Sequence, residues 1–416
     1  MEQTIIKETL IKNACGLDVH QKSIVACVMV QDKDNLVKEI KTFGTMTHNL
    51  EQLKEWMQAH SITHVAMEST GVYWKPVFNI IGEDFELILA NARHIKNVPG
   101  RKTDVRDAEW ICQLLRAGLL KGSFIPPQNV RELRNLTRHQ KKLQVQVTSE
   151  KNRLHKLLQD ANIKLSSILS DPFGKAGRAI LNDLASGITD SHLLAKHMKN
   201  DARLAAKKEL AVEALHGKFT QNHQFILKSI LEHIHYLATQ IEQYDQEIGQ
   251  IVSQHFQKVH ELLQTIPGIK KKGAHIIIAE IGVEMEHFPD EKHLSSWAGL
   301  SPGNNQSAGK QRHSRIAQGN KWLKSMLIEC AWAAIRKKNH YLNSKYRHLK
   351  SRIGHKKALV AIAHKMLIGA YFIIKKQTSY KDLGPERGGG RPKSMLKGYI
   401  KKLEALGYKV NAPHAA

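Results

Sequence analysis

Four acidic residues near the N-terminus have the types and spacing of a site for metal-assisted phosphoryl transfer. Asp18 and Glu68 each end a predicted strand, so both carboxylates emerge at one sheet edge if the two strands pair in parallel. Asp104 and Asp107 lie three residues apart at the start of a predicted helix and share one face of its first turn. Each acid alone is more often a turn former or a helix cap. Their joint placement predicts a catalytic set of four carboxylates.

This predicted acidic set, Asp18, Glu68, Asp104 and Asp107, offers only oxygen ligands, which suit Mg²⁺ or Mn²⁺. Four converging carboxylates would repel one another strongly without such cations. Two divalent ions about 4 Å apart can activate an attacking oxygen and stabilise a leaving oxygen on either side of a phosphate. The sequence therefore predicts that these residues are metal ligands and that Mg²⁺, or Mn²⁺, is the cofactor.

Ser307 is the candidate nucleophile. It lies in a segment rich in glycine and asparagine and is followed by three basic residues, Lys310, Arg312 and Arg315. A serine in such a segment is unremarkable by itself, but cations beside its hydroxyl could hold a phosphate and stabilise charge during attack. No histidine at a recognisable spacing offers a general base. Activation by the metal-bound acids is one way to fill that gap.

The charge of the chain indicates an anionic partner. The 416 residues include 63 Lys and Arg against 38 Asp and Glu, for a formal net charge of +25. Between Lys310 and the C-terminus there are 25 basic and 4 acidic residues, so most of the excess lies there. Aromatic residues interleave with these cations, which favours nucleic-acid binding over a solvated basic surface. Only the Gly- and Arg-rich stretch from about Gly384 to Lys393 is typical of a flexible arm.

Composition excludes several classes of protein. With 42% apolar and 24% charged residues, the chain is neither wholly disordered, nor collagen-like, nor a disulfide scaffold. No stretch approaches the roughly 20 apolar residues of a membrane span, and residues 1–13 lack a signal-peptide core. We therefore expect a soluble cytoplasmic protein. The four cysteines have no metal-ligand spacing and are expected to be small buried hydrophobes.

The elements that must position the acidic set alternate between strands and helices. Apolar runs and period-two patterns predict a three-strand meander followed by strand–helix–strand units, hence a mixed sheet with helices on its faces. The predicted strands are 15–19, 24–30, 36–43, 63–67 and 86–89, and the predicted helices are 47–60, 74–81 and 104–117.

The middle of the chain has the period of long helices. One apolar seam with steps of three and four runs from Leu133 to Leu157, and a second runs from Leu227 to Ile251. Both exceed three heptads, so they either pair with each other as an antiparallel hairpin or build a coiled-coil dimer. The stretch between them, 166–219, is predicted to be a helical insertion.

A third block resembles a helix-hairpin-helix. Apolar residues precede Pro267 and Gly268, and the three lysines 270–272 precede a second apolar helix. Such an arrangement places backbone N–H groups and lysines beside a phosphate without contact to base edges. An ordinary helix–turn–helix connection is the alternative. The predicted nucleic-acid-binding residues of the chain are Lys270, Lys271, Lys272, Lys310, Arg312, Arg315 and Lys321.

Together these motifs resemble the "one-ten" family of bacterial insertion-sequence transposases, also described as bridge-RNA-guided recombinases. Residues 16–20, 67–71 and 102–108 resemble the DEDD set of that family, on a fold similar to the RuvC Holliday-junction resolvase, and residues 266–269, 297–302 and 306–309 resemble its C-terminal transposase domain. The resemblance covers nearly the whole chain. The long middle block is similar to that of the subgroup with extended coiled coils.

The resemblance implies a bacterial, nucleoid-associated protein with a particular site and particular partners. It implies that Asp18, Glu68, Asp104 and Asp107 bind metal and that Ser307 becomes covalently linked to DNA. It also implies a noncoding bridge RNA that pairs with donor and target DNA. A homo-oligomer is expected, with a dimer that assembles into a tetramer and an active site shared between protomers. The implied fold is an α/β RNase H-like (RuvC-like) domain, a coiled-coil middle and a mostly α C-terminal domain with a helix-hairpin-helix.

Four regions follow from this interpretation. They are a RuvC-like DEDD domain over 1–125, a helical coiled-coil region over 126–260, a transposase domain with the serine over 261–380, and a basic flexible tail over 381–416. Two other functions stay open. One is a metal-dependent endonuclease or junction resolvase in which Ser307 has no catalytic role, and the other is a nucleic-acid-binding architectural protein without catalysis.

Overall fold

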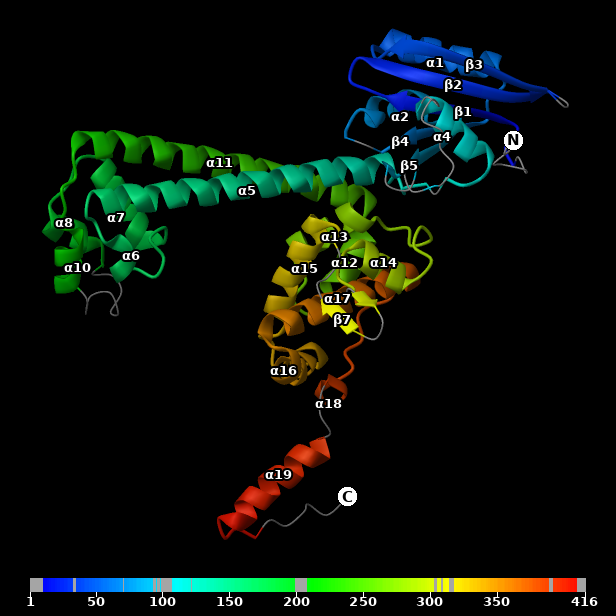
Figure 1. Ribbon diagram of the computed structural model, residues 1–416. Helices are drawn as coiled ribbons and strands as arrows, with labels where there is room; N and C mark the ends of the chain where they lie inside the picture. The colour runs from blue at the N-terminus through cyan, green and yellow to red at the C-terminus, as the bar shows by residue number, and fades with distance from the viewer. Residues whose placement is uncertain are drawn as a thin grey trace. The chain divides into compact units, whose positions relative to one another are not determined.

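The chain forms two compact units in the computed structural model, Met1–Pro126 and Pro127–Ala416, and each is described by itself (Figure 1). The structure describes residues 10–32, 35–69, 71–92, 95, 98, 107–120, 122–198, 208–302, 305–307, 310–313, 318–388 and 392–409. Asp104 and Arg315 therefore lie outside the described residues. The four-region division expected from the sequence stays a prediction.

The N-terminal unit is built on a five-stranded mixed sheet. Its strands are β1 (Asn13–Val19), β2 (Ser23–Asp32), β3 (Asn35–Gly44), β4 (His64–Glu68) and β5 (Glu86–Ala90). Their order is β3-β2-β1-β4-β5, with antiparallel pairs between β3, β2 and β1 and parallel pairs between β1, β4 and β5. This confirms the predicted meander followed by parallel strands, an arrangement compatible with the RNase H-like fold.

Helices cover both faces of this sheet. The helices α1 (Thr47–Ala59) and α2 (Trp74–Ile81) pack on one face, and α4 (Asp107–Arg116) packs on the other. The period of two along β1 divides its side chains accordingly, because Cys15 and Leu17 join the core with α1 and α2, whereas Ala14 joins the core with α4. Even-numbered positions of β1 therefore face α4.

The second unit begins with two long helices, α5 (Gln128–Asp160) and α11 (Gln221–His255), which lie side by side and are called the arm below (Figure 1). Their contacts run in opposite directions along the chain. The His139 ring stacks on Tyr244, and Asp160 accepts a hydrogen bond from His223 Nε2 at 2.9 Å, 63 residues later. The two predicted seams thus pair within one chain as an antiparallel hairpin.

A small helical domain connects the end of α5 to the start of α11 along the chain. It has a hydrophobic core of its own, in which Leu181, Leu194 and Leu215 are buried against Leu154 of the arm. This confirms the predicted helical insertion over the described residues. Its elements are α6 (Leu165–Ile168), α7 (Lys175–Ala185), α8 (Ser191–Ala195), the 3-10 helix η1 (Lys196–Met198) and α10 (Lys208–Leu215).

The C-terminal helices share one core with the end of the arm where α5 begins and α11 ends, which we call the root of the arm. Ile277 of α13 and Ile362 of α17 are fully buried in it together with Leu133 of α5. The elements are α12 (Gln257–Gln264), α13 (Lys271–Ile281), α14 (Glu291–Trp297), β6 (Asn305–Ser307), β7 (Lys310–His313), α15 (Lys321–Ala334), α16 (Tyr341–Ile353), α17 (His355–Lys376), α18 (Pro385–Gly388) and α19 (Pro392–Ala405). The predicted helix, Pro-Gly turn and second helix are α12, Pro267–Gly268 and α13.

Two features of this region differ from the predictions made from the sequence. Within the described residues, α17 is the one helix long and apolar enough to cross a bilayer by composition, yet its apolar side chains fill the core. The stretch predicted to be a flexible arm, from about Gly384 to Lys393, instead contains α18 and the start of α19. Proline is favoured as the first residue of a helix, and Pro385 and Pro392 each stand there. Gly388 is buried close to Ser344 of α16, so α18 packs on that helix.

Candidate active site

Two residues of the acidic set lie side by side at one edge of the sheet. The parallel pair β1–β4 places Gly16 opposite Ala66 and Leu17 opposite Met67. Asp18 follows Leu17 directly, and Glu68 follows Met67, so these two acids continue the same register. Because side chains alternate between faces, both acids share the face on which α4 packs.

The helix α4 begins at this same edge. Its first residue is Asp107, and its residue Cys112 packs against β1, where the Cys112 Sγ contacts the carbonyl oxygen of Ala14 at 3.3 Å. A Cβ added at Gly16 would lie 2.2 Å from the carbonyl oxygen of Ala108. Glycine at this position is what permits such a close approach of helix and strand. The structure therefore brings three of the four predicted acids to one edge of the N-terminal unit.

The charges of these acids act on one another. Burial raises the pKa of Asp18 above its usual value, and the negative charges of Asp107 and Glu68 raise it further. The imidazole of His20 partly opposes this effect, with its Nε2 3.1 Å from the Asp18 Oδ2. Burial is the larger cause, and the neighbouring carboxylates act in the same direction.

The residues present fit a divalent cation, although the described part of the chain holds no ready-made ligand cluster. Among the residues that the structure describes, no three His, Cys, Asp or Glu side chains are grouped closely enough to hold one ion. Asp104 lies outside them. The mutual repulsion at Asp18 is nevertheless what a bound cation would relieve, and oxygen is the donor that Mg²⁺ and Mn²⁺ prefer. Sequence alone did not single out His20 as a neighbour of this set.

Replacement of Gly16 by alanine should disturb this edge strongly. The new methyl group would overlap the backbone of α4 at Ala108 and Cys112, so the helix and Asp107 must shift away from β1. We expect a loss of about 1–3 kcal/mol of stability from overpacking. Gly122→Ala is the matched control, because its added Cβ meets Ile88 at an ordinary 3.6 Å. Thermal unfolding of both variants checks this, and a Gly16→Ala protein as stable as Gly122→Ala would contradict it.

Ser307 lies in a short β-hairpin, although its segment is rich in glycine and asparagine, residues typical of loops. The strands β6 and β7 pair antiparallel, with Ser307 opposite Lys310. Strands of three and four residues are too short for an alternating pattern to reveal. The serine thus ends one strand, and the first of the predicted phosphate-binding cations begins the next. Arg312 follows two residues later on β7.

The segment that carries this hairpin is closed at its base. A Cβ added at Gly319 would lie 2.3 Å from the backbone nitrogen of Gly299, so the two ends of the segment touch. Gly299 has a φ of 69°, a left-handed conformation that glycine adopts without strain. The serine segment, residues 299–319, therefore leaves and rejoins the core at one point. We refer to it by that name below.

The predicted lysines differ in their surroundings. Lys270 precedes α13 and is exposed, whereas the Nζ of Lys271 lies 3.0 Å from the Asp245 Oδ2 of the arm. Partial burial, followed by the charge of Lys141, lowers the pKa of Lys272. Lys321 is exposed at the start of α15, with its Nζ 5.3 Å from the centre of the Trp322 ring. All four lysines are exposed, but Lys271 already pairs with Asp245.

Comparison with known proteins identifies the family. Residues 15–163 match a family model described as "Transposase", and residues 260–347 match one described as "Transposase IS116/IS110/IS902 family". These two matches cover more than half of the chain and include the acidic set and Ser307. The chain belongs to the IS116/IS110/IS902 family of transposases. It is accordingly an enzyme that transposes or recombines DNA, as the sequence predicted.

Two relatives of this transposase extend over nearly its whole length. The "Pilin gene-inverting protein" of Moraxella bovis is 24% identical over 385 residues, which cover 89% of this chain and 98% of that protein. The protein of the same description from Moraxella lacunata has the same identity and coverage. The similarity therefore includes the arm and the small helical domain as well as both family regions.

Proposed function

We propose that this transposase breaks and rejoins DNA through a covalent serine–DNA intermediate with Ser307 as the nucleophile. The Oγ of Ser307 attacks a DNA phosphorus, and the Oγ–P bond forms while the bond from phosphorus to one strand oxygen breaks. The serine gives up its hydroxyl proton, and the departing strand oxygen takes up a proton. The resulting phosphoserine ester retains the energy of the broken phosphodiester bond, so rejoining to a second strand requires no ATP. The chain accordingly contains no GxxxxGK[ST] motif.

The observation that carries this proposal is the combination of two family regions in one chain. One contains acids gathered at a sheet edge, and the other contains a serine paired across a hairpin with Lys310. Asp18, Glu68, Asp104 and Asp107 are proposed to hold Mg²⁺ or Mn²⁺, which when bound neutralises charge on a phosphate and on attacking and leaving oxygens. Lys310 and Arg312 are proposed to bind the phosphate beside the serine.

The test is a suicide DNA substrate whose cut end cannot be religated. We expect a protein–DNA adduct that survives denaturation and disappears after protease digestion. The competing function is a metal-dependent nuclease or resolvase that uses the acids alone. Efficient strand cutting without any adduct would favour that nuclease and exclude the serine mechanism.

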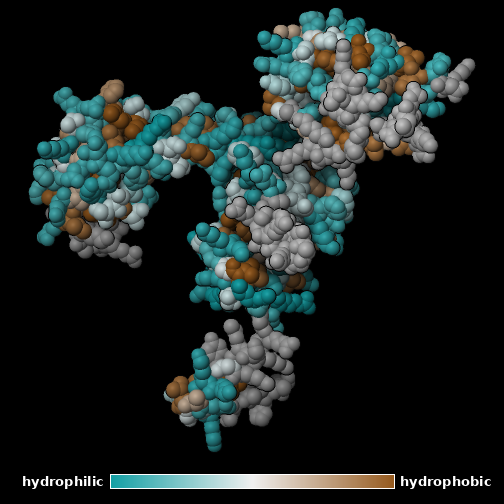
Figure 2. Space-filling view, in the orientation of Figure 1, coloured by the Kyte–Doolittle hydropathy of each residue, from teal (hydrophilic) through white to brown (hydrophobic). Residues whose placement is uncertain are grey.

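We further propose a noncoding RNA guide and a homo-oligomer, a dimer that assembles into a tetramer. A guide would place sequence recognition in base pairing and leave the protein to bind phosphates. Apolar side chains exposed on the arm support association with a second copy, among them Val145, Phe225 and Tyr236. Figure 2 shows that the arm surface is otherwise mainly hydrophilic. A foldable noncoding stretch beside the reading frame, complementary to the ends of the element, would support the guide, and its absence would count against it.

DNA binding should weaken steeply with salt, because clustered Lys and Arg release counterions from phosphate. We expect a loss of about a thousand-fold in affinity between about 50 and about 200 mM salt. Lys270→Ala should reduce the slope of log affinity against log salt by about 1. Lys271→Ala is the matched control and should change it less, since that lysine already pairs with Asp245. A nearly flat salt response would contradict the proposed role of the basic surface.

A further inference from the structure

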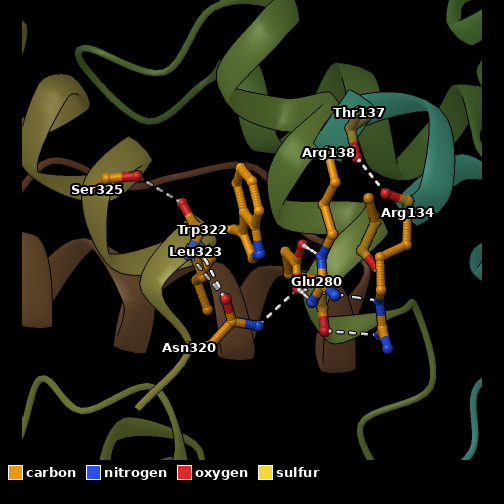
Figure 3. A network of polar contacts seen from close by, with 9 residues as sticks. Arg134, Thr137, Arg138, Glu280, Asn320, Trp322, Leu323 and Ser325 are labelled. Atoms are coloured by element: carbon orange, nitrogen blue, oxygen red, sulfur yellow. Dashed lines mark hydrogen bonds and ion pairs between the residues drawn. The ribbon is translucent and has the colours of Figure 1, made fainter. Parts of the chain in front are cut away.

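A buried carboxylate in α13 joins the arm to the core near the serine segment (Figure 3). Glu280 is 1% exposed although it stands in an otherwise apolar helix. Arg138 of α5 donates hydrogen bonds to both of its carboxylate oxygens, Nε to Oε1 at 2.8 Å and Nη2 to Oε2 at 2.7 Å. Such a bidentate pair fixes the plane of the carboxylate as well as its position.

The arm is attached to α13 by a second arginine. Arg134, one helical turn before Arg138, donates from Nε to the carbonyl oxygen of Ala279 at 2.7 Å and from Nη2 to that of Glu280 at 2.9 Å. These carbonyls lie at the C-terminal end of α13, where carbonyl groups lack partners within the helix. The root of the arm therefore holds the end of α13, and Glu280 with it, in one orientation.

The third partner of Glu280 is Asn320. The Nδ2 of Asn320 donates to the Glu280 Oε2 at 2.5 Å, while its Oδ1 accepts from the backbone nitrogens of Trp322 and Leu323 at 3.0 and 3.1 Å (Figure 3). Asn320 is thus the N-cap of α15. The amide oxygen of Asn320 caps the helix, and its amide nitrogen donates to the carboxylate of Glu280. Both polar atoms of the side chain are therefore held.

Asn320 is also the residue directly after the serine segment. Its neighbour Gly319 packs on Gly299 and closes that segment. The Arg138 guanidinium lies 5.8 Å from the centre of the Trp322 ring, which adds a second contact between α5 and the start of α15. The fixed point from which the segment departs is therefore set by Glu280 and, through Arg138, by the arm.

We propose that Glu280 is a positioning residue, which through Asn320 fixes the base of the serine segment and makes the presentation of Ser307 depend on the root of the arm. This inference rests on the proposed function of Ser307. An N-cap needs no carboxylate behind it, and a buried ion pair contributes little net stability on average. We therefore assign to Glu280 the orientation of Asn320 and of the base of the serine segment.

The test keeps the cap and removes only its link to Glu280. Asn320→Asp retains an N-cap oxygen for α15 but opposes one carboxylate to another. The double variant Glu280→Gln/Asn320→Asp restores an amide beside a carboxylate. Asp290→Asn is the matched control, because Asp290 caps α14 through the backbone nitrogens of Lys292 and His293 without contact to Glu280.

We expect Asn320→Asp to slow adduct formation about tenfold, to leave DNA affinity within about twofold, and to speed hydrogen exchange of the β6–β7 amides. The double variant should recover most of both effects, and Asp290→Asn should show neither. Wild-type exchange and wild-type adduct formation in Asn320→Asp would overturn the inference, and so would faster exchange without a slower reaction.

Failure of the proposed function is distinguishable from failure of this inference. If Ser307→Ala still formed the adduct, the serine mechanism would be wrong whatever Asn320→Asp did. If only Asn320→Asp behaved as wild type, the serine mechanism would stand and the positioning role would not. Adduct formation by Asn320→Asp could instead fall only in proportion to a lower melting temperature and not recover in the double variant. That result would also overturn positioning, in favour of a purely structural role.

Discussion

Ser307→Ala should lose DNA cleavage and rejoining by at least about a thousand-fold while DNA binding stays unchanged. Removal of a nucleophile abolishes the covalent route, and what remains is the weak background from the other groups of the site. Since Ser307 ends β6 opposite Lys310, loss of its hydroxyl leaves the backbone pairing of the hairpin intact. Strand exchange in a reconstituted reaction measures the loss.

Ser301→Ala is the matched control for this variant. Ser301 lies in the same segment, and its backbone nitrogen bonds to the carbonyl oxygen of Ser295, so its hydroxyl is not needed to hold the turn. The control should react at close to the wild-type rate. Equal losses in the two variants would indicate a general effect on the segment, and full activity of Ser307→Ala would remove the serine from the mechanism.

Asp18→Asn should abolish cleavage to a similar extent. The substitution removes one negative charge from the set that includes Glu68 and Asp107 and thereby weakens its affinity for a divalent cation. Because β1 is central in the sheet and Asn has the size of Asp, the fold should be retained. Cleavage assays over a range of Mg²⁺ and Mn²⁺ concentrations measure the effect.

Asp32→Asn provides the comparison for Asp18→Asn. Asp32 is exposed at the opposite end of β2 from Val25, the residue that pairs with Asp18. Its substitution removes the same charge from the same unit without touching the acidic set. If both variants cleaved DNA equally well while binding persisted, the acids would be structural, and the architectural alternative would gain support.

The N-terminal unit was largely predictable because its strands are short apolar runs bounded by polar residues. The predicted helix 74–81 coincides with α2, and strand 86–89 falls within β5. The alternation along β1 also placed Asp18 and Glu68 at one edge, once the parallel pairing of β1 and β4 was assumed. The contribution of Gly16 was not foreseen, since the approach of α4 to β1 is a tertiary contact.

Other features were beyond the sequence for identifiable reasons. The spacing of apolar residues along a helix is the same whether the helix pairs within its own chain or with a second copy. Contacts within the chain, such as that of His139 with Tyr244, are needed to reveal the hairpin. The partner of the buried Glu280 is another such feature. That partner, Arg138, lies 142 residues away, and no local pattern specifies it.

The most direct test of the account is to identify the residue linked to DNA. The transposase would be trapped on a suicide substrate with Mg²⁺, digested with protease, and the peptide bearing a nucleotide remnant sequenced by mass spectrometry. We expect one modified peptide, with the nucleotide on Ser307, and no modified peptide from the Asp18→Asn protein. A nucleotide on any other residue, or cleavage with no modified peptide, would contradict it.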